Sequence, residues 1–135
     1  MTINSRAKGH AFEREIVNKL RDELGEIVDE PIKRILDQYR EVELPDIVVP
    51  PFAIECKRYA KGSTYRPEWW TQVTLASEKA GLIPALVYRY DRQQMQCVVP
   101  LYAINPDYPR TNECQAIVDW CDFVMIMREN IVASA

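Results

Sequence analysis

The chain has 135 residues, of which 47% are hydrophobic and 27% charged, and its formal net charge at pH 7 is −3. This size and composition predict one globular domain. No apolar run approaches transmembrane length and the N-terminus lacks the basic-then-apolar pattern of a signal peptide, so we expect neither a transmembrane segment nor a signal peptide. The four cysteines form no CxxC motif and there is a single histidine, which argues against a structural zinc site. We therefore expect a cytoplasmic protein with reduced cysteines, and a single domain over residues 1–135.

The net negative charge is not typical of a nucleic-acid-binding protein, but it is unevenly distributed. Residues 107–135 contain five acidic residues and two arginines, which account for the whole net charge, whereas residues 1–106 are balanced. A working surface in the first part of the chain can therefore still be positive. The candidates for phosphate contacts are Lys8, Arg14, Arg34, Arg40, Arg58 and Lys61. Ordinary solvated surface charge is the alternative for each of them.

The first predicted element is a helix over residues 5–24, with Asn4 or Ser5 as the N-cap and Gly25 as the stop signal. At about 100° per residue its apolar side chains fill one stripe: Phe12, Ile16, Val17, Leu20 and Leu24. Glu13 falls inside this stripe. A buried carboxylate is costly unless it is paired, so Glu13 is expected to bind a cation, to pair with an arginine, or to reach water at the margin of the stripe.

The next elements contain the most informative residues. Residues 31–41 are compatible with a short helix from Pro31 or with a strand from residue 35. Strands are predicted over residues 46–50 and 53–58, separated by a turn at Pro50 and Pro51. This turn would bring Asp46 next to Glu55. Because side chains alternate along a strand, Lys57 points to the same side as Glu55.

A polar loop over residues 61–66 precedes a helix predicted from Pro67 to about residue 80. Trp69 and Trp70 lie on its apolar face, where they either pack in the core or stack on unpaired bases, and Gln72 lies on the flank of that face. Strands are predicted over residues 85–90 and 95–101. Beyond Pro100 the pattern favours a helix over residues 113–121 and a strand over residues 123–127. The order of elements predicts an α/β fold with a central mixed β-sheet flanked by helices.

The residue types at this sheet edge fit metal-dependent phosphodiester cleavage. Mg²⁺ prefers oxygen ligands and needs only one or two carboxylates beside the substrate, and Asp46, Glu55 and the backbone carbonyl of Cys56 would provide them. Lys57 would hold the attacking water or stabilise the transition state. Glu13 would bind a second ion or a metal-bound water, and Gln72 would orient the nucleophile. The alternative for Glu55 and Lys57 is a surface ion pair of little energetic value.

Four sequence motifs carry a resemblance to a known family. They are Lys8-Gly9-x-x-x-Glu13-Arg14-Glu15, Pro45-Asp46, Ile54-Glu55-Cys56-Lys57 and Gln72-Val73. In this order they resemble the PD-(D/E)XK nuclease superfamily, and more narrowly the archaeal-type and phage-encoded Holliday junction resolvases, over about residues 5–90. One departure is the segment 35–43, which replaces a small, basic, Gly- or Ser-rich segment of the archaeal enzymes.

The resemblance implies a restriction-endonuclease-like fold with metal-binding acids at Glu13, Asp46 and Glu55, a catalytic lysine at Lys57 and a phosphate contact at Arg14. It also implies Mg²⁺ as the cofactor, with Mn²⁺ able to substitute, and a homodimer that cuts branched DNA in a prokaryotic host or its phage. The nuclease core would span about residues 5–105, with residues 106–135 as an extension. The alternatives are a nuclease for linear, nicked or single-stranded DNA, and a non-catalytic DNA-binding or assembly protein of the same fold.

Overall fold

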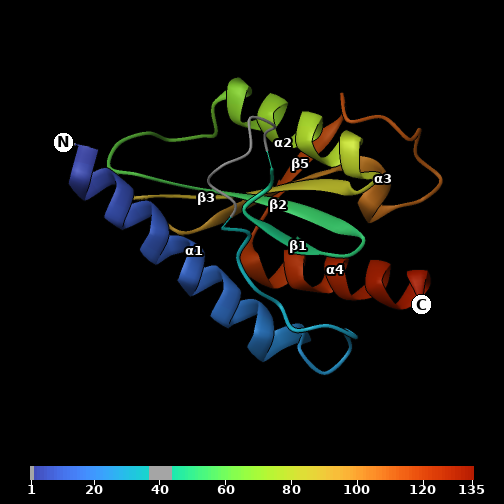
Figure 1. The fold of residues 1–135 in the computed structure, drawn as a ribbon. Helices are drawn as coiled ribbons and strands as arrows, with labels where there is room; N and C mark the ends of the chain where they lie inside the picture. The colour runs from blue at the N-terminus through green and yellow to red at the C-terminus, as the bar shows by residue number, and fades with distance from the viewer. Residues whose placement is uncertain (1, 37–43) are drawn as a thin grey trace.

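A computed structural model describes residues 2–36 and 44–135 of the chain. Its centre is one five-stranded sheet with the order β1-β2-β3-β4-β5, and helices cover both faces (Figure 1). The elements are α1 (Thr2–Leu24), β1 (Ile47–Val49), β2 (Phe52–Tyr59), α2 (Pro67–Ala80), β3 (Ile83–Tyr90), β4 (Gln96–Pro100), α3 (Leu101–Ile104), β5 (Gln115–Val118) and α4 (Trp120–Ser134). The predicted α/β fold with a central mixed sheet is confirmed.

The direction of the strands determines where the connections lie. β1 and β2 form an antiparallel hairpin around Pro50 and Pro51, in which Val49 pairs with Phe52. β2 and β3 are parallel, so the chain must return along the sheet between them, and α2 is that crossover connection. β3, β4 and β5 follow as antiparallel neighbours. This parallel pair, the only one among the described strands, thus places a helix directly over β2 and β3.

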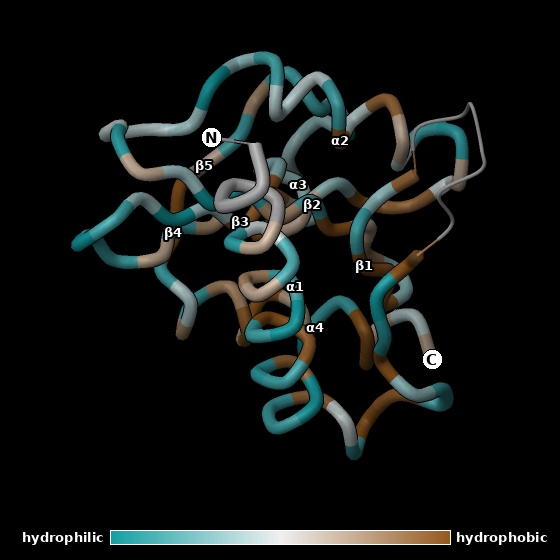
Figure 2. Tube along the Cα trace, turned by 60° about the vertical axis from the view of Figure 1, so that its left-hand side comes forward, coloured by the Kyte–Doolittle hydropathy of each residue, from teal (hydrophilic) through white to brown (hydrophobic). Residues whose placement is uncertain are grey.

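Helices α1 and α4 cover one face of the sheet (Figure 1). The apolar stripe of α1 is buried there as predicted, and Gly25 ends this helix at a point where a Cβ atom would lie 2.5 Å from the carbonyl oxygen of Arg21. On α4 the fully buried Phe123 packs edge-on against Phe52 of β2, with their ring centroids 6.3 Å apart. Figure 2 shows the apolar strands inside the molecule and the mainly hydrophilic turns at its periphery.

Helix α2 covers the opposite face. Its side chains Trp69, Trp70 and Val73 pack with Leu86, Tyr88, Tyr90 and Val98 in a second apolar cluster. The two tryptophans are only 4% and 7% exposed. Of the two predicted alternatives for these residues, packing in the core is therefore the one that occurs.

Two predictions for the C-terminal part of the chain are wrong. Residues 113–121 were expected to be helical but contain the strand β5, and residues 123–127 were expected to be a strand but belong to the helix α4. Asp119 caps α4 by accepting a hydrogen bond from the Asp122 amide. The buried side chains of α4 recur at helical spacing from Phe123 to Ile131, which the compact apolar run 123–127 conceals.

In the segment before β1, the described residues 31–36 do not form the helix that was one of the two predicted alternatives. Over residues 31–36 the chain forms an isolated antiparallel bridge between Arg34 and Ile47, and the rest of the ambiguous segment, residues 37–41, lies outside the described residues. Within residues 2–36 and 44–135, no helix is both long enough and apolar enough to span a bilayer.

The packing of α4 generates a prediction for stability. Replacing Phe123 by Ala should lower the free energy of unfolding by about 3–5 kcal/mol, because it leaves a cavity against Phe52. Urea unfolding followed by circular dichroism measures this loss. Met125→Ala is the control, since Met125 is 55% exposed on the same helix and should change stability by less than about 0.5 kcal/mol. Equal effects of the two substitutions would show that α4 does not stabilise the core.

Candidate functional site

The site begins where the β1–β2 ladder ends. Ile47 pairs with Ile54 in the ladder, yet the amide of the preceding residue, Asp46, also donates to the carbonyl of Ile54 at 3.0 Å. Two residues of one strand thus oppose one residue of the other, which is the arrangement of a β-bulge. Beyond the bulge, the Cys56 amide of β2 donates to a side chain and not to a backbone carbonyl of the neighbouring strand. The acceptor is Asp46 Oδ2, at 2.8 Å.

Cys56 contributes to this site through its backbone. The N–H and C=O of one residue point to the same edge of a strand, so the carbonyl of Cys56 faces the side on which Asp46 lies. The thiol lies in the core on the other face of the sheet, together with Ile54. Burial, followed by the charge of Asp46, raises the pKa of this thiol well above its ordinary value.

Glu55 and Lys57 lie on the face that α2 covers. Gln72 of α2 bridges them, because its amide oxygen accepts from Lys57 Nζ at 2.9 Å and its Nε2 donates to Glu55 Oε1 at 3.4 Å. Lys57 Nζ itself is 3.8 Å from Glu55 Oε1. With Glu55 only 4% exposed, this is not the solvent-exposed ion pair that was the alternative. The structure thus brings together four of the predicted site residues: Asp46, Glu55, Lys57 and Gln72.

The Glu55 carboxyl group is in an unfavourable environment for a negative charge. Burial, and then the nearby charge of Asp46, raises the pKa of Glu55 to about 9, although Lys57 acts in the opposite direction. Its second oxygen, Oε2, is buried and accepts no hydrogen bond from the residues that the structure describes. A proton on Glu55 can be shared with the Asp46 carboxylate, and this hydrogen bond between the two acids also raises the pKa of Glu55. A buried carboxyl oxygen that accepts no hydrogen bond, next to a second carboxylate, is the environment that a cation would stabilise.

The donor set fits an oxygen-preferring ion such as Mg²⁺ better than a metal such as Zn²⁺, which favours nitrogen and sulfur ligands. In the part of the chain that the structure describes, no three His, Cys, Asp or Glu side chains lie close enough to ligate one ion by themselves. Mg²⁺ does not need such a cage, because it retains waters and binds one or two carboxylates together with substrate phosphate. Two carboxylates and a backbone carbonyl satisfy that requirement.

Glu13 lies on α1 and is paired with Arg34, whose Nε is 3.2 Å from Glu13 Oε1. This is one of the three outcomes predicted for an acid inside the apolar stripe. Arg34 Nη2 is also 2.7 Å from Nδ1 of His10, so it is held between two residues of α1. Partial burial, and then the charge of Asp46, raises the pKa of Glu13, while Arg34 lowers it. The charge of Asp46 thus affects the pKa of Glu13, although the Glu13 carboxylate is hydrogen-bonded to Arg34.

With this geometry described, the comparisons with known proteins identify the family. A family model described as "Phage putative PDDEXK endonuclease" matches residues 4–119. The chain belongs to this family of phage PD-(D/E)XK endonucleases. The match includes every motif on which the sequence-based resemblance rests. No curated protein sequence matches the chain.

Among solved structures, the chain of this PD-(D/E)XK endonuclease is similar to Hjc of Archaeoglobus fulgidus, a Holliday junction resolvase from an archaeal hyperthermophile. The similarity covers 87% of this chain and 93% of Hjc, with 18% sequence identity and a TM-score of 0.50. At this identity the comparison shows a common fold. The predicted restriction-endonuclease-like architecture is thereby confirmed.

Three of the five predicted phosphate-contacting residues that the structure describes are paired with acids. Lys8 Nζ is 3.1 Å from the Asp91 carboxylate, which also pairs with Arg58. Hydrogen bonds from Lys8, and then from Arg58, lower the pKa of Asp91. Arg34 is paired with Glu13, as described above. These cations can meet DNA phosphate only by sharing or exchanging their present partners.

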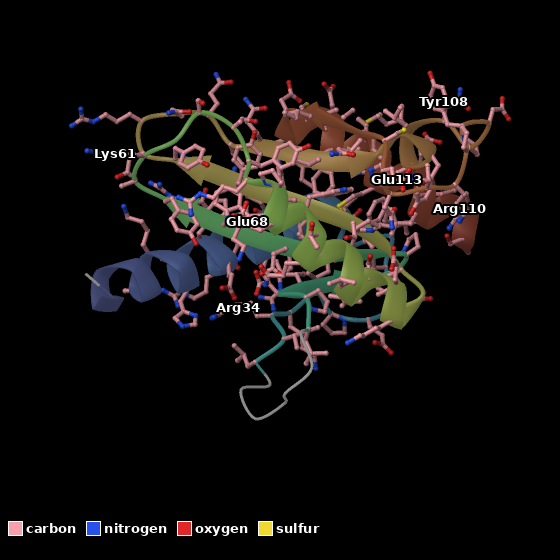
Figure 3. All side chains as sticks on the ribbon, turned by 90° about the horizontal axis from the view of Figure 1, so that it is seen from above. Arg34, Lys61, Glu68, Tyr108, Arg110 and Glu113 are labelled. Carbon is pink, nitrogen blue, oxygen red and sulfur yellow. The ribbon has the colours of Figure 1, made fainter. Side chains whose placement is uncertain are left out.

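The remaining predicted contacts differ in their exposure. Arg14 and Lys61 are exposed and make none of the ion pairs found within residues 2–36 and 44–135. Figure 3 shows Arg34 near the start of β1 and Lys61 on the loop that follows β2. Arg40 lies outside the described residues. Sequence analysis did not identify Asp91 as a partner of two cations, because the pairing joins residues 83 positions apart.

The environment of Glu55 generates a prediction for the pH dependence of stability. Below pH 4.5 the folded and unfolded chains both hold this proton, whereas between pH 4.5 and about 9 only the folded chain retains it. The unfolded state then binds fewer protons, so stability falls as the pH rises through this range. Glu55→Gln should remove this loss and raise the free energy of unfolding by about 1–3 kcal/mol at pH 7 without metal.

Urea unfolding in chelator at pH 5, 7 and 8.5 measures the effect. Glu68→Gln is the matched control, because Glu68 is an exposed glutamate of α2. Parallel curves for the wild type and Glu55→Gln would contradict the raised pKa of Glu55.

Proposed function

We propose that this PD-(D/E)XK family member is a Mg²⁺-dependent endonuclease that hydrolyses phosphodiester bonds in branched DNA. One observation carries the proposal: the buried Oε2 of Glu55, which accepts no hydrogen bond from the described residues, lies in a carboxyl group that is close to Asp46 and Lys57. Such a cluster of buried acids is unfavourable for folding. Clusters of this kind occur at functional sites, and a bound cation would both stabilise the two acids and take part in phosphodiester hydrolysis.

The residues that would hold the ion are Asp46, Glu55 and the carbonyl of Cys56. Glu13 is paired with Arg34, and on exchange of that partner it would bind a second ion or a metal-bound water. Mn²⁺ would substitute for Mg²⁺, because it accepts the same oxygen ligands. When bound, the ion supplies Lewis acidity that activates water and neutralises negative charge on the phosphate.

Lys57 provides a positive charge that does not depend on the ion. In the structure its ammonium group is 2.9 Å from Gln72 Oε1. We propose that it donates hydrogen bonds to the attacking water or to a non-bridging phosphate oxygen, where it stabilises the developing charge. Gln72 uses its amide oxygen for Lys57 and its amino group for Glu55. Its proposed role is therefore to fix the positions of these two side chains and, through them, to orient the nucleophile.

A branched substrate and a homodimer are the finer parts of the proposal. They are supported by the fold that the chain shares with an archaeal Holliday junction resolvase and by the order of motifs in the sequence. Two sites related by a twofold axis can act on two opposed strands of one junction. Lys8, Arg14, Arg34, Arg40, Arg58 and Lys61 are the proposed phosphate contacts. We place this activity in the cytoplasm of the prokaryotic host, which agrees with membership of a phage family.

Removing either charged group from the site should abolish cleavage. For Glu55→Ala and Lys57→Ala we expect losses of cleavage rate of about a thousandfold or more, with retained DNA binding, because each removes a group needed in the transition state. The assay is single-turnover cleavage of labelled DNA. Lys79→Ala, at the far end of α2, is the control. Undiminished cleavage by both site variants would contradict the assignment.

The substrate and the cofactor are tested on one panel of labelled DNAs: a four-way junction, a splayed arm, a nicked duplex, a plain duplex and a single strand. Paired cuts confined to the junction, present with Mg²⁺ or Mn²⁺ and absent with chelator, are expected. A mass in solution near twice 15.7 kDa would accompany them. Cleavage of linear DNA would agree with the assigned catalytic residues but contradict the proposal of a branched substrate. Binding without any cleavage would support the non-catalytic alternative.

A further inference from the structure

An aromatic ring and an arginine lie together at the end of β2, close to the candidate site. Tyr59 is the last residue of β2 and is 37% exposed, unlike the buried Trp69 on which it stacks, with ring centroids 5.1 Å apart and planes 12° from parallel. The guanidinium of Arg66 lies 4.8 Å from the Tyr59 ring and 5.2 Å from the Trp69 ring. Arg66 is exposed and makes none of the ion pairs found in the described residues.

This pair of side chains faces the same way as the candidate catalytic residues. Lys57 and Tyr59 both contact residues of α2, namely Gln72 and Trp69, as expected for positions two apart on one strand. Two residues of a strand span about 6.6 Å. A nucleotide adjacent to a phosphate at Lys57 would therefore be within reach of Tyr59.

The loop that carries Arg66 is held in place by several contacts. Tyr90 Oη donates to the carbonyl of Thr64, and Gln93 Nε2 donates to that of Gly62, both at 2.6 Å. Gly62 lies so close to the Tyr90 ring that a Cβ atom at this position would clash with it. A ligand would thus meet a surface that is already ordered, which reduces the entropic cost of binding.

We propose that Tyr59 and Arg66 form a subsite for an unpaired nucleotide, an inference that rests on the proposed nuclease function. The base would stack on the exposed part of the Tyr59 ring or on the Arg66 guanidinium plane, and Arg66 would also contact a phosphate. In an intact duplex the faces of the bases are covered by their neighbours. The subsite therefore favours DNA in which bases near the cut are unpaired.

Equilibrium binding in chelator tests the subsite without interference from cleavage. Two labelled DNAs of equal length and charge are compared by fluorescence anisotropy, one fully paired and one with a mismatched, unpaired stretch. Tyr59→Ala should weaken binding to the unpaired DNA about tenfold and leave binding to the paired duplex unchanged, while Tyr59→Phe should preserve both. For the unpaired DNA, Arg66→Gln should make the slope of log K against log[salt] less steep by about one unit, as expected when one phosphate contact is lost. Leu75→Ala, which removes a half-exposed apolar side chain from α2, is the control.

A second readout uses the unmodified protein, so that it does not depend on the folding of any variant. 2-Aminopurine in the unpaired stretch should lose fluorescence on saturation, because its base stacks on the aromatic ring. The proposed subsite would be wrong if Tyr59→Ala lost the same affinity for both DNAs, or if 2-aminopurine emission did not change on binding. Neither result would contradict the proposed nuclease function. Failure of the wild-type protein to bind any DNA would overturn both.

Discussion

Burial of the Glu55 carboxyl group beside Asp46 is the unfavourable interaction that the surrounding structure has to offset. Lys57 and Gln72 contact only one of its oxygens, Oε1, and no donor among residues 2–36 and 44–135 is bonded to Oε2. The protein alone therefore stabilises this arrangement incompletely. Sites of this kind lower the stability of the folded state. A cation that would offset the repulsion between the two carboxylates is also the group that nuclease chemistry needs.

The topology of the sheet explains how these groups reach one place. Alternate residues of β2 serve two purposes, since Ile54 and Cys56 fill the core below α1 and α4 while Glu55 and Lys57 face α2. The parallel pairing of β2 with β3 requires a crossover, and the crossover helix places Gln72 over both charged side chains. One strand thus supports the fold with one face and carries the charged groups of the site on the other.

Much of this could be predicted from the sequence because it depends on local patterns. Alternation along residues 53–58 and the Pro50-Pro51 turn were enough to place Asp46 near Glu55, and the flank position of Gln72 on its helix was read correctly. The partners of the cations could not be predicted, because pairs such as Lys8 with Asp91 form only when distant elements meet. The C-terminal errors arose where five apolar residues in a row hid a helical stripe that continues to Ile131. The roles of the site residues remain proposals.

The bulge at Asp46 makes the chain unequally tolerant of changes in length on its two sides. The β1–β2 ladder is set in register from the Pro50-Pro51 turn and ends at the bulge. One residue added or removed between Asp46 and the turn would send the carboxylate to the opposite face of the sheet. Among the described residues N-terminal to the bulge, none pairs with β2, so none transmits such a shift to this strand. The number of residues from Asp46 to the turn is therefore fixed by the position that the Asp46 carboxylate has to keep beside the Cys56 amide.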